Sequence, residues 1–536
     1  MEANHHLQKI TVLGSLNFMA GVNIPYVPQI TMSNSRGEVQ GLPWLIWVVV
    51  IFGSISSTGF GFDSGWWSGI MTSAQFTRRF GSFDHVSKQW ALTSQQQSLG
   101  TGLGYLGIIL GLFCGAPLTT RLGRKKTLWI QSFVAILGII IEATTKSSYV
   151  QFIIGKLVVF FSCGIATSVI PTYQGECAPQ GLRGLMSGAY NAFLMIGGFA
   201  STLIVYLCRH ISSDWSWRIV IIAQVVIPFI SWISLPFLPE SPHWLISQGR
   251  FEEATVVIRR LRGPDFPAES EVALIQQELL KQRERNAKAT WVSCVEDPVN
   301  RRRTFIAVGT QILQQAQGIS FVANYQAVFL QRIGFKEVLL MSVVVYIIGI
   351  VANLVGMALT DKLGRRIVML WSATLLGACM LIIGGLTAKG SSNMTYPLQI
   401  ASTVMFVLWF FVFQISWGPL AWVITAEVPA LQVREKMVAL SGLSAYLTGL
   451  VIVFVDPYTQ AAIGGSVAFI YGAFSIVSVI FVWFFVPELR QRSLEQIDEM
   501  FRERLPTRAF KSHVCRIPAD AAFEKPHQPQ CTEAVA

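Results

Sequence analysis

Charged residues are scarce in this sequence. They make up 13% of its 536 residues, about half of the ~25% that is usual in soluble domains. A soluble protein of this length would need charged side chains over most of its surface, so the composition excludes that class. Hydrophobic residues account for 52%, and they recur along the whole chain in runs long enough to cross a bilayer as helices, which takes about 20 residues.

Three further signals are missing. None of the eight cysteines falls in a segment expected to face outside, so we expect no structural disulfide. No basic region precedes an uninterrupted apolar core among the first 40 residues, so we expect no cleavable signal peptide. No grouping of His, Cys or Ser argues for an enzyme, and we expect no catalytic residues, metal site or cofactor.

Twelve apolar runs define the predicted fold, an all-α membrane protein. Only helices can carry such runs through lipid, because every backbone polar group must pair internally. A hydrophilic stretch, 247–303, divides the runs into six and six. The predicted spans are 43–62, 95–118, 127–145, 149–170, 185–208, 218–238, 304–330, 337–360, 367–387, 398–424, 436–456 and 463–486.

The chain therefore divides into five predicted segments. A cytoplasmic N-terminal segment precedes the first six-helix half, and a short intracellular helical linker joins it to the second half with its terminal helix. The polar tail contains four prolines and is expected to be disordered. The segments are 1–42, 43–246, 247–303, 304–500 and 501–536.

Basic residues set the predicted orientation. The stretch 247–303 is rich in Arg and Lys, and so are the short loops 121–126 and 362–366, while loops on the other side are poor in them. Lys and Arg are retained on the cytoplasmic side, which places both termini there. The same retention explains the net charge of +11 without nucleic-acid binding. The sequon Asn393-Met-Thr395 falls on the outer side and predicts glycosylation of Asn393.

Three motifs in the first half return in the second half, in the same order and about 240–250 residues later. Gly115-Ala-Pro-Leu-Thr-Thr-Arg121-Leu-Gly-Arg124 returns as Gly356-Met-Ala-Leu-Thr-Asp361-Lys362-Leu-Gly-Arg365. Glu176 with Arg183 returns as Glu427 with Arg434, and Pro239-Glu240 returns as Pro487-Glu488. Such a repeat predicts two parallel halves related by an axis along the membrane normal.

These motifs resemble those of the sugar porter family of the major facilitator superfamily, over roughly residues 45–500. The resemblance implies a transporter that moves a sugar across a membrane, and we expect a monomer in the plasma membrane. The further matching motifs are Gly61-Phe-Asp63-Ser-Gly65, Pro171-x-Tyr173-x-x-Glu176, Pro239-Glu240-Ser241-Pro242-His243-Trp244-Leu245, Gln314-Gln315-x-x-Gly318, Gly418-Pro419-x-x-Trp422 and Arg492-Ser493-Leu494-Glu495.

Charged residues in the loop motifs are predicted to form a cytoplasmic gate. Ion pairs among them would hold the two halves together while the sugar site faces outward, and would break when it opens inward. Alternatively, the charges only anchor the topology. Thr120 stands where the family usually has Asp, so the first set of pairs is expected to be weaker or differently partnered. The gate residues are Arg121, Arg124, Glu176, Arg183, Glu240, Asp361, Arg365, Glu427, Arg434 and Glu488.

Asp63 is the predicted proton site. A carboxylate inside an apolar span is costly and therefore points to function. In similar family members an acid here marks proton coupling, and a basic residue on span 4 partners it; Lys156 matches that residue. A proton on Asp63 would release Lys156 and bias the switch between conformations. The alternative is a fixed ion pair that carries no proton.

The resemblance also implies a sugar pocket at the midplane, between the halves. Amides both donate to and accept from hydroxyls, and an indole can stack on a pyranose. Several positions differ from hexose carriers and are similar to fungal α-glucoside and lactose-type carriers, which take disaccharides. Gln311 and Gln317 are equally explained as helix-packing residues. The substrate-facing positions are Asn191, Gln314, Gln315, Ser320, Gln414, Trp422 and Tyr446.

Four functions remain open from the sequence. The first is a symporter of a proton with a mono- or disaccharide, and the second is a facilitator that passes sugar or polyol downhill. The third is a carrier of a non-sugar metabolite, because the pocket positions differ from those of hexose carriers. The fourth is a non-transporting sugar sensor, although such a protein is expected to need a longer tail than the one present here.

Overall fold

The computed structural model describes residues 43–84, 89–178, 183–335, 337–388, 395–490 and 492–515, and these are predominantly helical. The predicted segment 1–42, the sequon residue Asn393 and the tail beyond 515 lie outside the described residues.

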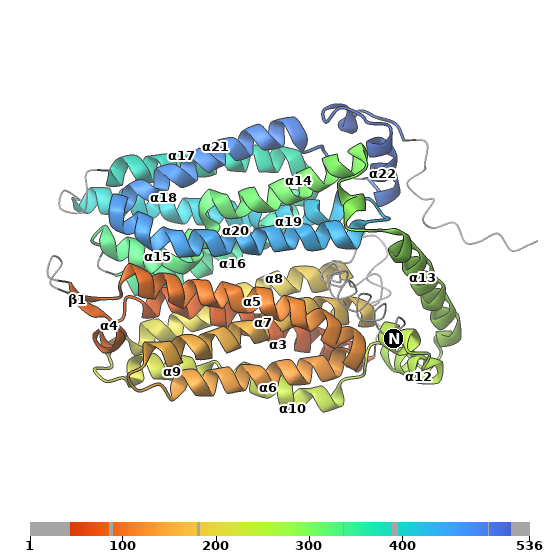
Figure 1. The fold of residues 1–536 in the computed structure, drawn as a ribbon, viewed down its shortest axis with the longest axis horizontal. Coiled ribbons are helices and arrows are strands. Elements are labelled where there is room, and N and C mark those ends of the chain that lie inside the picture. The colour runs from red at the N-terminus through yellow and green to blue at the C-terminus, as the bar shows by residue number, and fades with distance from the viewer. Residues whose placement is uncertain are drawn as a thin grey trace, which may run out of the picture.

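Six membrane crossings form the first half, which is the lower group of helices in Figure 1. The sixth crossing is divided in two near Gln224. Its helices are α3 (Trp44–Ile70), α5 (Ser94–Leu122), α6 (Arg124–Ala143), α7 (Tyr149–Cys177), α8 (Arg183–Leu207), α9 (Trp215–Ala223) and α10 (Val226–Ser234).

The second half, the upper group in Figure 1, repeats this arrangement with two broken crossings. The π-helical turn η6 (Gln315–Ile319) interrupts the seventh crossing, and Ser416 interrupts the tenth. The helices are α14 (Pro298–Gln314), α15 (Ser320–Arg332), α16 (Val338–Leu363), α17 (Arg365–Thr387), α18 (Tyr396–Ile415), α19 (Trp417–Glu427), α20 (Arg434–Ile463) and α21 (Val467–Phe485).

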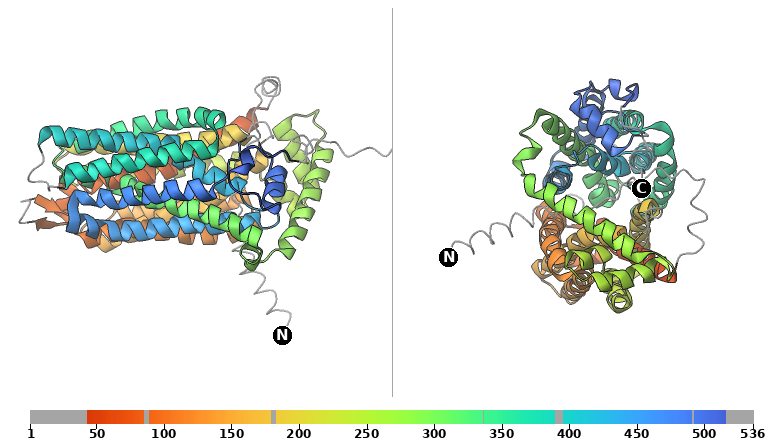
Figure 2. Two further views of the ribbon diagram at one scale, coloured as in Figure 1. Left: turned by 90° about the horizontal axis from the view of Figure 1, so that it is seen from above. Right: turned by 90° about the vertical axis from the view of Figure 1, so that its right-hand side faces the viewer.

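Ten helical segments of the described chain are long and apolar enough to span a membrane. One of these, Arg434–Phe485, holds two crossings, α20 and α21, which are drawn as two separate blue helices in Figures 1 and 2. The interrupted seventh crossing adds one more. The predicted twelve-helix fold is thereby confirmed, with each helix boundary within several residues of its predicted place.

The two ends of the bundle differ. At the linker end, α11 (Pro242–Ser247), α12 (Phe251–Arg262) and α13 (Ala268–Lys288) lead from one half to the other, with α22 (Leu494–Arg502) nearby (Figure 1). At the opposite, hairpin end lie α4 (Ala74–Phe80) and an antiparallel pair of strands, β1 (Ser82–Asp84) and β2 (Gln89–Ala91). Short 3-10 turns are η3 (Cys208–His210), η4 (Leu235–Phe237), η5 (Val292–Cys294), η8 (Gly464–Ser466) and η9 (Ala509–Lys511).

Capping side chains explain several helix starts. Thr93 accepts a hydrogen bond from the backbone N–H of Gln96, whose side chain in turn accepts from the N–H of Thr93, and the two form a capping box before α5. Ser493 and Gln496 form the same motif before α22. Such caps satisfy N–H groups that have no partner within the helix. The starts of these two helices are therefore determined by residues that are close to them in the sequence.

The tail differs from its prediction. Residues 501–515 were expected to begin a disordered segment, but they fold back against the start of the second half. Arg302 donates to the carbonyl of Leu505 at 2.8 Å, and the Phe510 side chain is fully buried beside Phe501. The prediction is wrong for this stretch because the sequence pattern did not reveal the aromatic contacts that anchor it.

Candidate functional site

The halves join at the hairpin end. Ser98 Oγ on α5 donates to the carbonyl of Phe454 on α20 at 2.8 Å, and Ser94 donates to the carbonyl of Pro457 at 3.2 Å. The backbone N–H of Ala327 on α15 donates to Ser68 Oγ on α3 at 3.0 Å. These bonds link the two halves between the midplane and the hairpin end, which indicates that this end is sealed.

A break in the seventh crossing presents three of the predicted sugar-facing residues. Gly318 has φ +112°, a left-handed conformation that suits glycine, and it lies within the π-helical turn. Ser320 Oγ donates to Gln315 Oε1 at 2.7 Å. Gln314 donates instead to the carbonyls of Trp417 and Gly418, both at 3.0 Å. Its amide therefore stabilises the break in the tenth crossing, which leaves Gln315 as the more available amide.

The remaining predicted pocket residues come from both halves. Gln414 contacts Met195 across the interface, with 3.7 Å between Nε2 and Sδ. Asn191 is exposed and lies one turn from Met195 on the same face of α8. Trp422 is half-buried and is adjacent to Gly442 on α20. Tyr446, also half-buried, lies close enough to Tyr105 and Tyr190 of the first half to interact with them electrostatically.

Two polar residues of this region escaped the sequence analysis. Asn324 on α15 donates to Tyr105 Oη on α5 at 3.2 Å and to the carbonyl of Ser320 at 2.8 Å. This contact crosses between the halves beside Ser320. The sequence did indicate Asn324, because it lies one helical turn after the predicted pocket residue Ser320. Its hydrogen bond to Tyr105, more than 200 residues away, could be seen only in the structure.

The packing explanation fits Gln311 and Gln317. Both are fully buried. Gln311 donates to Thr425 Oγ1 and Gln317 to Ser478 Oγ, each at 3.0 Å, and both bonds tie helices of the second half together. Neither side chain faces the first half through these contacts.

Asp63 occupies a polar position inside the first half. Gly61 and Gly65 lie on one face of α3 and allow its close approach to α8, since a Cβ at Gly61 would lie 1.9 Å from the carbonyl oxygen of Leu194. Asp63 projects from another face, where it accepts a hydrogen bond from Cys163 Sγ on α7 at 3.2 Å. Gln224, with its amide oriented to satisfy both neighbours, donates to Asp63 at 3.0 Å and accepts from Trp66.

Lys156 is near Asp63 without a direct ion pair. Its side chain is 2% exposed, and its Nζ has no hydrogen-bond partner in the described chain. The ammonium lies 3.3 Å from the ring centroid of Trp67, a cation–π contact, and 5.4 Å from that of Trp66. The structure therefore places the predicted pair close enough to interact electrostatically, with the ammonium over Trp67.

Glu142 is a second buried carboxylate that the sequence analysis missed. It lies on α6 and is fully buried, and neither carboxylate oxygen has a hydrogen bond of normal geometry in the described chain, although the Gln224 amide lies close enough to interact with it. Among charged groups it acts most strongly on Lys156, ahead of Asp63. The same argument that singled out Asp63 applies to an acid in span 127–145. We did not single it out because it lies near the predicted end of that span, where charged residues are common.

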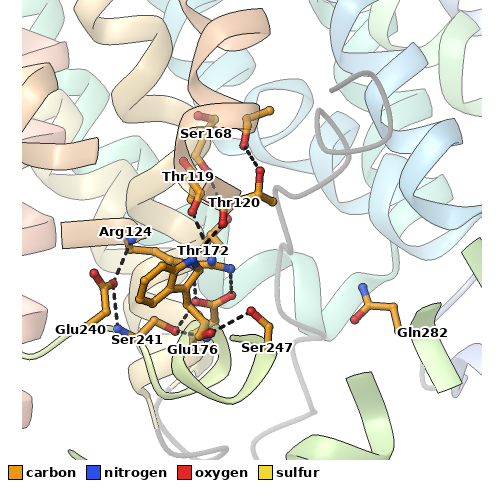
Figure 3. A network of polar contacts seen from close by, with 12 residues as sticks. Thr119, Thr120, Arg124, Ser168, Thr172, Glu176, Glu240, Ser241, Ser247 and Gln282 are labelled. Atoms are coloured by element: carbon orange, nitrogen blue, oxygen red, sulfur yellow. Dashed lines mark hydrogen bonds and ion pairs between the residues drawn. The ribbon is translucent and has the colours of Figure 1, made fainter. Parts of the chain in front are cut away.

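The charged loop of the first half forms a compact network at the linker end (Figure 3). Arg124 donates to Glu176 through two bonds, at 2.8 and 2.6 Å, and its backbone N–H donates to Glu240 at 2.9 Å. Ser241 also donates to Glu176, and Trp244 Nε1 donates to the carbonyl of Thr120 at 2.9 Å. The network joins α6, α7 and α11 around one arginine.

The second half repeats this network. Arg365 donates from its backbone N–H to Glu488 at 2.9 Å and from its guanidinium to Glu427 at 3.3 Å. Gly123 and Gly364, which precede the two arginines, both have φ +91°, and each faces a glutamate carboxylate. The internal repeat of the sequence is thus a repeat of side-chain geometry.

Two features of the observed ion pairs bear on the predicted gate. Each observed ion pair joins helices of one half rather than the two halves. The pair at Arg124 has a shorter N–O distance, 2.6 Å, than the pair at Arg365, 3.3 Å, and the Thr120 hydroxyl bonds to its own helix at the carbonyls of Ala116 and Pro117.

The other predicted gate residues are placed less fully. Arg121 is exposed at the end of α5. Arg434 begins α20 and interacts electrostatically with Glu427. Arg183 and Asp361 lie in α8 and α16, but their side chains are outside the description.

Gly123→Ala is expected to destabilise the protein more than Gly249→Ala. Both glycines have positive φ, so both substitutions carry backbone strain of about 1–3 kcal/mol. At Gly123 an added Cβ would also lie 2.6 Å from Glu240 Oε2, whereas nothing lies within 4 Å at Gly249. Thermal unfolding of the purified protein in detergent measures both. Equal losses would show that Glu240 yields freely and that the contact is unimportant.

A model of the family described as "Sugar (and other) transporter" matches residues 49–501. The chain belongs to this family. The transporter is a multi-pass membrane protein of the major facilitator superfamily, and the predicted family and class are confirmed.

Known relatives of the transporter include proteins of two kinds. It is 28% identical over 468 residues to the high-affinity glucose transporter ght5 of Schizosaccharomyces pombe, covering 85% of this chain and 84% of that one. It is also 28% identical over 479 residues to the high glucose sensor RGT2 of Saccharomyces cerevisiae, covering 85% of this chain but only 60% of the sensor.

The fold of the transporter matches that of the proton:xylose symporter XylE bound to 6-bromo-6-deoxy-D-glucose. The TM-score is 0.68 at 21% identity, with 85% of this chain and 99% of XylE covered.

Proposed function

We propose that this protein is a sugar:proton symporter that works by alternating access, with Asp63 as the proton-binding carboxylate. The observation that carries the proposal is the position of Lys156, a buried ammonium near Asp63 with no hydrogen-bond partner among the residues that the structure describes. Protonation of Asp63 removes its attraction for Lys156, and the redistribution of charge biases the equilibrium between conformations. The relative XylE is described as a proton:xylose symporter, which supports the same assignment.

The linker end is proposed to face the cytoplasm and the hairpin end to face outside, with both termini cytoplasmic and the protein in the plasma membrane. Retention of Lys and Arg at the linker end supports this orientation. With the hairpin end sealed by Ser94, Ser98 and Ala327, the conformation described is one in which the sugar site opens inward. Re-pairing of the gate residues between the halves, including Arg183, Asp361 and Arg434, would belong to the outward-facing state.

The proposed sugar site lies between the halves, at Asn191, Gln414 and Tyr446 and along the broken seventh and tenth crossings at Gln314, Gln315, Ser320 and Trp422. Their amide and hydroxyl groups match the alternating donors and acceptors of a sugar. The glucose transporter among the relatives supports a hexose. Because several pocket positions differ from those of hexose carriers, a disaccharide is the alternative substrate. A non-sugar metabolite is the second alternative, if neither monosaccharides nor disaccharides are transported.

A competition panel of mono- and disaccharides in a transport-null host, at two external pH values, tests the proposal. We expect saturable uptake of at least one sugar, stimulated at the lower external pH and abolished by collapse of the proton gradient. Saturable uptake that does not depend on the proton gradient would contradict symport and indicate facilitated diffusion. Absence of uptake of every sugar would contradict the sugar site and favour a sensor or a non-sugar carrier, although the sensor relative is considerably longer than this chain.

Trp422→Ala is expected to raise the KM for sugar about tenfold, because an indole face that stacks on a sugar ring contributes on the order of 1 kcal/mol or more. Initial uptake rates over a range of sugar concentrations measure the change. Trp371→Ala is the matched control, since Trp371 is 74% exposed on the outside of α17 and should leave KM unchanged. A KM for Trp422→Ala equal to that of the control would remove Trp422 from the sugar site.

A further inference from the structure

We propose that Glu142 is the second partner of Lys156, and that it holds the ammonium while Asp63 carries the proton. The inference rests on the proposed proton coupling and extends it to a residue on another helix. It starts from three buried charged side chains that converge from three helices: Asp63 on α3, Glu142 on α6 and Lys156 on α7.

Close packing of α6 on α7 brings Glu142 to Lys156. Gly155 immediately precedes Lys156, and a Cβ added to it would lie 2.7 Å from Glu142 Cγ. Gly138, one turn before Glu142, would likewise bring a Cβ within 3.0 Å of the carbonyl oxygen of Gly155. Two glycines thus allow the carboxylate to lie over the turn that carries the lysine, and the contact would be lost if either had a side chain.

Unmade hydrogen bonds indicate that this cluster changes its pairing. Neither oxygen of Glu142 has a hydrogen bond of normal geometry in the described chain, and the Gln224 amide is the one neutral group close enough to interact with its carboxylate. The Nζ of Lys156 has no partner in the described chain, and both side chains are more than nine-tenths buried. A buried, unpaired ion is costly, so such groups pair or become neutral. Lys156 instead lies over Trp67 and interacts electrostatically with both carboxylates.

The surroundings supply few other charges. Asp63, Lys156 and Cys163 are the titratable groups on α3 and α7 that interact electrostatically with Glu142. Gln224 on the sixth crossing lies close to both acids, Asp63 and Glu142, and contributes only an uncharged amide. Arg218 on α9 is nearby at the helix end, but its guanidinium donates to the carbonyl of Thr145. Lys156 is therefore the main counter-charge for both acids.

The charge balance explains why two acids would share one lysine. With Asp63 and Glu142 both ionised and Lys156 protonated, the cluster has one net negative charge. One proton on Asp63 makes it neutral, with Lys156 paired to Glu142; loss of that proton returns Lys156 to Asp63. Without Glu142, the protonated cluster would instead carry a net positive charge in an apolar interior. Glu142 is therefore expected to keep Asp63 protonated up to a higher pH than Asp63 would reach without it.

Position also suits this role. Glu142 is one residue from the end of α6 at the hairpin end, whereas Lys156 lies two turns into α7 from that end and Asp63 two turns before the end of α3. Movement of Lys156 toward Glu142 would therefore draw its charge toward the hairpin end and away from Asp63. No second proton is required for this exchange.

Uptake measured against external pH in Glu142→Gln, Glu142→Leu and Glu142→Asp tests the inference. We expect both neutral variants to need a pH about 1 unit or more lower for half-maximal uptake, and the aspartate variant to retain the wild-type profile. Asp456→Asn is the matched control. Asp456 is a buried carboxylate in the second half, held by Gln460 and Tyr471, and its removal should not move the profile.

Sugar exchange at equal pH in proteoliposomes shows whether each variant folds and binds sugar. Unshifted profiles in the neutral variants, with a pH-dependent wild type, would overturn the inference and leave symport intact. A wild type without pH dependence would overturn the proposed symport and the inference with it. Loss of exchange in both neutral variants, with Glu142→Asp active, would assign Glu142 to folding and also overturn the inference.

Discussion

Asp63→Asn is expected to abolish gradient-driven accumulation of sugar. Asparagine preserves the size of the side chain but cannot take up a proton, so the link between proton binding and the movement of Lys156 is lost. Accumulation ratios in cells or proteoliposomes with an inward proton gradient should fall at least tenfold, to the level set by simple equilibration.

The same variant should retain sugar exchange at equal pH on both sides. Asp63 is hydrogen-bonded to Cys163 and Gln224 within the first half and is separate from the polar residues of the broken seventh crossing. Exchange within a few-fold of wild type would therefore separate coupling from sugar binding. Undiminished accumulation in Asp63→Asn would rule out Asp63 as the proton site and favour a fixed structural role for it.

Arg124→Ala is expected to lower the free energy of unfolding by about 3–5 kcal/mol. Removal of one member of a buried ion pair leaves the other buried and uncompensated. Here Glu176 would lose both guanidinium bonds, and the side chains of the pair are only 8% and 10% exposed. Thermal unfolding of the purified protein in detergent measures the loss.

Arg121→Ala provides the control for this prediction. It removes the same charge from the same basic loop, but from an exposed position, and should change stability by less than about 0.5 kcal/mol. Arg365→Ala should give an intermediate loss, because its bond to Glu427 is longer and its carboxylate partner is 22% exposed. Equal stability of the Arg121 and Arg124 variants would show that these charges serve topology alone.

Hydropathy predicted the crossings well because each one must satisfy its own backbone and expose apolar side chains to lipid. The breaks within the crossings were harder to predict from the sequence. The Gln-Gln-x-x-Gly motif was recognised, but the π-helical turn depends on the positive φ of Gly318 beside Tyr471, and the contact of Gln314 with the carbonyls of Trp417 and Gly418 beside the break at Ser416 is a tertiary one.

Whether a site residue could be predicted depended on where it lies in the sequence. Asp63 and Lys156 were found because each is a charge within an apolar run or belongs to a family motif. Glu142 was missed because its span appeared to end there, and Asn324 because its partner Tyr105 lies in the other half. The gate residues stay a prediction; in the conformation described, the observed ion pairs among them lie within each half.

The sequence by itself determined the membrane class, the twelve crossings, the twofold repeat and the family. These depend on hydrophobic run length and on motifs that are local in the chain. Only the tertiary structure decided which charges meet. The partner of a buried ion is set by helix packing, here by glycines at the α6–α7 contact that bring Glu142 to Lys156. The loop motifs therefore identified a transporter, while the packing of its helices indicated how a proton could drive it.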